Sequence, residues 1–107
     1  MQQLDPVALR HWLDGPPNSR PGVLDVREPW EVERCAIEGS VAIPMAEIPS
    51  RIGDLDPGRP WVVVCHHGMR SLQAALFLER QGFDRMHNLL GGIDAWAVQV
   101  DPAMPRY

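Results

Sequence analysis

The sequence predicts an α/β fold over residues 1–107, with three layers (α/β/α) around a mostly parallel sheet of about five strands, in a single domain. Short apolar runs alternate with helical stretches, which is typical of βαβ units and of a parallel sheet covered on both faces. The strongest run, residues 61–65 (WVVVC), is continuously apolar and rich in valine, as buried parallel strands are. A chain of this length is also long enough to bury one core.

The first half of the chain is expected to begin with a helix and to continue with two short strands. Asp5 followed by Pro6 is a typical helix start, because the acid can cap the first amides and proline suits the first turn. This helix runs to Leu13, where a loop rich in proline and glycine ends it. Residues 22–26 (GVLDV) and 41–45 (VAIPM) predict strands. Helical pieces are expected after each strand, at 28–36 and 46–52.

The second half contains the clearest strand and the clearest helix. After the strand at 61–65, residues 71–81 (SLQAALFLERQ) have a helical pattern of apolar residues. Gly82 fits the left-handed position that ends a helix, with Phe83 expected to touch Leu78. The remaining predicted elements are a strand at 85–90 and, after a tight glycine turn, a helix at 93–100.

The composition argues against several classes of partner and cofactor. The formal net charge of −4 disfavours nucleic acid or an anionic membrane as the main partner. All 10 basic residues are arginine, which excludes Schiff-base chemistry on lysine. Two cysteines are too few for a disulfide framework, and cysteine and histidine lack the spacing of a metal site. We therefore expect no cofactor and no metal and, without an apolar span or a signal-peptide core, a cytoplasmic protein.

Cys65 is the candidate nucleophile. It ends a buried strand, and ligands of parallel sheets bind beyond the carboxyl ends of strands. Gly68 allows the loop at 65–70 (CHHGMR) to turn tightly, so that backbone amides and the start of the next helix form an anion-binding nest. Arg70 adds a fixed positive charge. All these groups favour a thiolate, so we predict that the pKa of Cys65 lies below the free value.

The other cysteine and the loop histidines receive simpler interpretations. A cysteine at a strand end is often only a small buried hydrophobic residue, but the glycine, arginine and helix start favour a nucleophile at Cys65. Cys35 lies in a polar, acidic segment and is interpreted as a packing residue. His66 and His67 are adjacent, and we expect at most one of the two rings to approach the sulfur.

Three motifs, in the same order as in a known family, support this interpretation. Residues 65–71 (CHHGMRS) resemble the C-x-x-G-x-R-[ST] active loop of rhodanese-like sulfurtransferases. Residues 24–31 (LDVREPWE) resemble the "DVRE" segment of that family, and residues 88–96 (NLLGGIDAW) resemble its "GG-x-x-x-W" segment. The sequence departs from the family at 35–40, where CAIEGS replaces GHIPGA, and at His66, where relatives often have arginine.

The resemblance implies transfer of a sulfane sulfur from thiosulfate or a persulfide to a thiophilic acceptor, cyanide or a thiol, through a persulfide on Cys65. Asp25 and Arg27 are expected to support the active loop from the neighbouring strand end. The residues expected to bind the donor are those of the loop and the helix start: His66, His67, Gly68, Met69, Arg70 and Ser71.

Two alternatives remain open. Related phosphatases and arsenate reductases use C-x5-R, but here only four residues separate Cys65 from Arg70, and the smaller loop suits a sulfur atom better. The other alternative is a sulfur carrier or regulatory binding module that delivers persulfide to a partner in a sulfur relay. The same loop would serve such a carrier.

Overall fold

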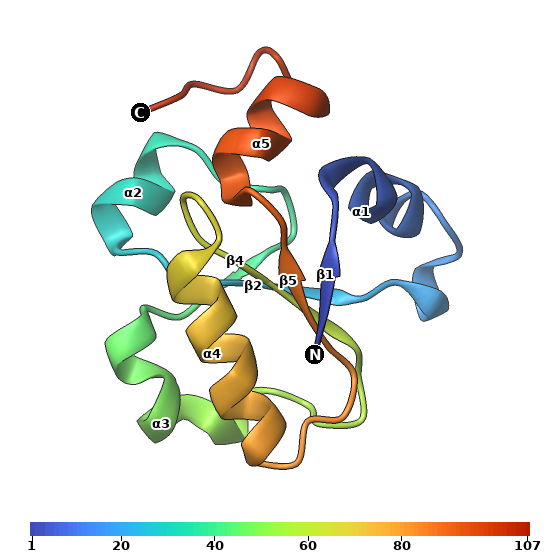
Figure 1. Ribbon diagram of the computed structural model, residues 1–107, viewed down its shortest axis with the longest axis vertical. Coiled ribbons are helices and arrows are strands. Elements are labelled where there is room, and N and C mark those ends of the chain that lie inside the picture. Colours follow the sequence, from blue (N-terminus) through green and yellow to red (C-terminus); the bar gives the residue numbers. More distant parts are fainter.

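The computed structural model describes residues 1–107 and contains one sheet of five parallel strands in the order β1-β5-β4-β2-β3 (Figure 1). The strands are β1 Gln2–Leu4, β2 Gly22–Asp25, β3 Val41–Ala42, β4 Trp61–Val64 and β5 Met86–Leu89. The helices are α1 Pro6–Leu13, α2 Pro29–Arg34, α3 Ile48–Arg51, α4 Met69–Arg80 and α5 Gly92–Gln99. Short 3-10 turns occupy Pro17–Ser19, Met45–Glu47 and Ile52–Asp54. The predicted α/β class is confirmed.

The core forms two layers, one on each face of the sheet. Successive side chains of a strand point to opposite faces, so Val62 and Val64 of β4 join one apolar cluster while Trp61 and Val63 join the other. Helices α3 and α4 cover the Trp61 face, and α1 and α5 cover the Val62 face. Because both of its faces are buried, β4 is held rigidly, and so is the position at which it ends.

Local signals correctly predicted where α1 begins and where α4 ends. The carboxylate of Asp5 accepts a hydrogen bond from the Ala8 amide (2.8 Å) and caps α1. At the end of α4 the Phe83 amide donates to the Leu78 carbonyl (3.1 Å), which is the bond expected for this type of helix ending. No helix of this fold has both the length and the apolar character required to cross a membrane.

Other elements differ from the prediction. The edge strand β1 was not predicted, because three largely exposed residues give no apolar alternation. The predicted strand at 41–45 is only two residues long and exposed, since Pro44 has no amide to continue the ladder. Helix α4 begins at Met69 rather than Ser71, directly after Gly68. Helix α2 ends at Arg34, so Cys35 lies outside it in extended backbone.

Candidate active site

Cys65 lies where β4 ends, at the base of the loop that leads into α4. Its side chain is 1 % exposed. Gly68 has a φ of 103°, a conformation that side chains rarely adopt, and this turns the loop back so that its amide faces the sulfur. The Gly68 amide donates to Cys65 Sγ over 3.1 Å. The turn thus places a hydrogen-bond donor at the sulfur.

Ser71, in the first turn of α4, is the other direct neighbour of the sulfur. Its Oγ lies 3.2 Å from Sγ and 2.5 Å from Oδ1 of Asn88 on β5. The Asn88 amide is fixed by its own donation to the Gly68 carbonyl (3.1 Å), so its oxygen faces Ser71. A serine hydroxyl has one proton, and therefore Asn88 and a Cys65 thiolate compete for it.

The hydrogen bonds to the Cys65 sulfur together lower its pKa by more than burial raises it. Burial acts to raise the pKa of the Cys65 thiol, but hydrogen bonds from the Ser71 hydroxyl and from the amides of Ser71, Gly68 and His67 lower it, and the pKa lies below the usual range. Arg70 also interacts with the thiolate charge, since Cys65 is among the groups that raise the pKa of Arg70, but the hydrogen bonds to the sulfur are the larger causes. The nest of donors that the sequence predicts is therefore the main feature that stabilises a thiolate here.

Arg70 forms a two-pronged ion pair with Glu31 of α2, at 2.7 and 2.9 Å. The Arg70 guanidinium holds the pKa of Glu31 at about 2, with burial opposing the effect. The fixed positive charge of Arg70 is therefore compensated by an acid 39 residues away in the chain, a pairing that the sequence does not reveal. Its contact with an anionic donor stays a prediction. Sequence reasoning missed Glu31, although its capping box with Glu28 is visible in the EPWE stretch.

Asp25 and Arg27 form a buried ion pair at the end of β2. Arg27 is fully buried, and its Nη2 donates to Asp25 Oδ2 (2.7 Å) and to the Cys35 carbonyl (2.7 Å). Its Nη1 donates to the Glu31 carbonyl (3.2 Å) and to the Tyr107 hydroxyl (2.9 Å). The pair thus joins β2, α2 and the C-terminal segment, and its contacts lie around the active loop rather than at Cys65 Sγ.

Three further loop residues differ in their exposure and contacts. His66 is half-buried, whereas His67 and Met69 are exposed, Met69 to 70 %. Burial and the neighbouring His67 lower the pKa of His66, so His66 is neutral at pH 7. Met69 therefore lies at the rim of the site, and of the two histidines only His66 is partly buried.

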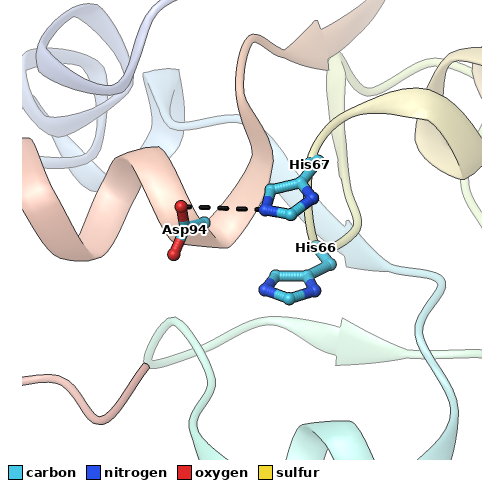
Figure 2. A group of neighbouring side chains, drawn as sticks. All are labelled: His66, His67 and Asp94. Atoms are coloured by element: carbon cyan, nitrogen blue, oxygen red, sulfur yellow. Dashed lines mark ion pairs between the residues drawn. The ribbon is translucent and has the colours of Figure 1, made fainter. Parts of the chain in front are cut away.

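His66 and His67 stack on each other, with ring centroids 4.1 Å apart, and Figure 2 shows Asp94 of α5 across from His67. That at most one of the two rings approaches the sulfur stays a prediction; both rings lie together because the tight turn does not alternate its side chains as a strand does. The three side chains offer ligand atoms within 4.8 Å of one another. However, lone pairs of stacked rings run parallel rather than converging, and Arg106 occupies the Asp94 carboxylate (2.8 and 3.1 Å). This cluster is poorly arranged for a metal ion, and a metal-free site remains a prediction.

The start of α5 is hydrogen-bonded to the backbone of the active loop. The Ile93 amide donates to the Cys65 carbonyl (2.8 Å), and the Asp94 amide donates to the His66 carbonyl (3.2 Å). A Cβ on Gly92 would collide with the backbone of Cys65 and His66. The second glycine of the pair at 91–92 is therefore required by a close backbone approach that sequence alone did not reveal.

The chain matches known proteins over most of its length. A family model described as rhodanese-like domain matches residues 6–99. A sulfurtransferase of Allochromatium vinosum is 40 % identical over 75 residues, which cover 70 % of each protein. The thiosulfate sulfurtransferase GlpE of Shewanella oneidensis is 38 % identical over 74 residues, covering 69 % of this chain and 73 % of that protein.

Similar domains also occur in longer proteins. The rhodanese-like/PpiC domain-containing protein 12 of Arabidopsis thaliana is 37 % identical over 89 residues, and the match covers 79 % of this chain but only 30 % of that protein. Among solved structures, a rhodanese-related protein of Thermoplasma volcanium superposes with a TM-score of 0.84 at 29 % identity, covering 94 % of both chains.

Proposed function

Because the chain belongs to the family of rhodanese-like domains, whose relatives include sulfurtransferases, we propose that it moves a sulfane sulfur from thiosulfate or a persulfide to cyanide or a thiol through a persulfide on Cys65. One observation carries the proposal. The Cys65 sulfur lies at the carboxyl end of the central strand, and the Gly68 amide and the Ser71 hydroxyl meet it at 3.1 and 3.2 Å.

The reaction would proceed in two displacements. The Cys65 thiolate attacks the outer sulfur of thiosulfate, the S–S bond of the donor breaks, and sulfite leaves with the bonding electron pair. The outer sulfur of the resulting persulfide carries the negative charge, which the nest of amides and the Ser71 hydroxyl can stabilise. Cyanide then attacks this sulfur to form thiocyanate, and the Cys65 thiolate returns. No oxidant or reductant is needed.

The charges around the loop favour a persulfide donor over thiosulfate. Glu31 compensates Arg70, and the lowered pKa of His66 keeps that ring neutral at pH 7. Thiosulfate carries both of its negative charges close to the reacting sulfur, and it gains little attraction from a loop without free positive charge. A thiol persulfide carries only one negative charge at its reacting end, so its binding depends less on such attraction. We therefore expect the ratio of kcat/KM for glutathione persulfide to kcat/KM for thiosulfate to be higher here than in a protein whose active loop carries a free positive charge. A protein thiol in a sulfur relay would serve as the natural acceptor in the same chemistry.

The test compares the two cysteines by mass spectrometry and by turnover. Incubation of the protein with thiosulfate or glutathione persulfide should add one sulfur atom to Cys65, and cyanide should remove that atom as thiocyanate. Cys65→Ser should abolish both the mass gain and turnover, whereas Cys35→Ser, the matched control, should keep most activity. A persulfide on Cys35, or turnover that survives in Cys65→Ser, would overturn the proposal.

A further inference from the structure

The C-terminal segment, residues 101–107, folds back over the active loop. Figure 1 shows it running from the end of α5 across to α2. Arg106 holds it to Asp94 of α5 through two contacts, at 2.8 and 3.1 Å. Met104 and Tyr107 pack against the apolar cluster that contains Ile93. The segment is thus attached at several points on the side of the molecule where the loop lies.

Tyr107 contacts one end of the active loop directly and is linked to the other end through Glu31. Its ring stacks on His66, the residue after Cys65, with centroids 4.1 Å apart and planes 13° from parallel. Its hydroxyl donates to Glu31 Oε1 (2.9 Å), the carboxylate that holds Arg70 at the other end of the loop. The same hydroxyl accepts a hydrogen bond from Arg27 (2.9 Å).

This arrangement leaves no room for a donor on the side of the tail. The space between the segment, α5 and the loop is lined by Cys35, His66, Asp94 and Tyr107, among others, and is too narrow to hold a water molecule. Cys65 itself is 1 % exposed. A sulfur donor therefore reaches Sγ only after the loop, or a part of the chain packed on the loop, moves.

We propose that residues 101–107 form a lid over the active loop and that Tyr107 is the residue that limits donor size. Thiosulfate needs only a small opening. Glutathione persulfide carries a tripeptide and needs the ring of Tyr107 to leave His66. The limit on donor size rests on the proposed sulfur transfer, whereas closure of the lid is a property of the fold and is testable without it.

Closure is tested first by alkylation, which requires no sulfur donor. The rate constant for iodoacetamide labelling of Cys65, assigned by peptide mass, is compared in the wild type, Tyr107→Phe, Tyr107→Ala and the control Ala103→Ser, an exposed position on the same segment. When the lid closes faster than the reagent reacts, this rate constant is proportional to the open population. Loss of the hydroxyl, which bonds two charged groups, should raise it about tenfold in Tyr107→Phe. Tyr107→Ala should raise it further, and the control should not change.

Two measurements distinguish lid opening from general destabilisation and from failure of the proposed function. Local opening exposes little surface, so the labelling rate constant of the Tyr107 variants should not change at low urea concentrations. Tyr107→Ala should also increase kcat/KM for glutathione persulfide severalfold relative to thiosulfate.

Unchanged labelling in both Tyr107 variants, or a rate constant that rises steeply with urea, overturns the lid. Faster labelling with an unchanged donor ratio overturns the size limit. Absence of transfer from either donor in every variant, the wild type included, overturns the proposed function and leaves the labelling result as the measure of the lid.

Discussion

Replacing Glu31 by glutamine should make the protein less stable at neutral pH and less sensitive to acid. The pKa of Glu31 is lowered from 4.5 to about 2, mainly by its hydrogen bonds with Arg70. Each pKa unit corresponds to about 1.4 kcal/mol, so the carboxylate contributes about 3 kcal/mol to the free energy of unfolding above pH 4.5. Because Arg70 is 38 % exposed and solvent screens the pair, we expect about 2 kcal/mol.

The sign of the pH dependence follows from the lowered pKa. The contribution is complete above the unfolded-state pKa of 4.5 and is lost as the pH falls toward the folded-state pKa of about 2. Urea unfolding, followed by the fluorescence of the 4 tryptophans between pH 7 and pH 3, measures this loss. Between pH 6 and pH 3 the wild type should lose about 1.5 kcal/mol more than Glu31→Gln.

The matched control is Glu33→Gln, an exposed glutamate on the same helix. It should be as stable as the wild type at pH 7 and should show the same pH dependence. If the wild type and Glu31→Gln lose stability in parallel between pH 6 and pH 3, the Glu31 carboxylate is not held in its charged form by Arg70. The account of the loop in which Glu31 compensates Arg70 would then be wrong.

Two further substitutions test the environment of the sulfur. Ser71→Ala removes a hydrogen bond that favours the thiolate, so the pKa of Cys65 should rise, and the midpoint of the pH profile for iodoacetamide labelling should move to higher pH. An unmoved midpoint would show that the Ser71 proton stays on Asn88. Gly92→Ala brings a methyl group against the backbone of Cys65 and His66. Thermal unfolding should show that the free energy of unfolding falls by about 2 to 4 kcal/mol. Gly53→Ala, at an open position, is its control, and equal stability of the two variants would contradict the close approach.

Much of the fold and the centre of the site could be predicted because their signals are local. The run at 61–65 predicts a buried strand by its composition, and Asp5 with Pro6 predicts a helix start by its side-chain chemistry. The edge strand β1 could not be predicted in this way. Its three residues carry no pattern of their own, and they form a strand only because β5 offers a parallel edge for pairing.

The sequence by itself determined the loop that presents Cys65, because a strand end, a glycine and a helix start fix the backbone over a few neighbouring residues. Only the tertiary structure decided which charges and rings surround that loop. Glu31 reaches Arg70 across 39 positions and Tyr107 reaches Glu31 across 76, so neither pair is visible in any local pattern. The parallel sheet brings α2, the active loop and the C-terminal segment to the same end of the strands, and the packing there pairs Arg70 with Glu31 and buries Cys65.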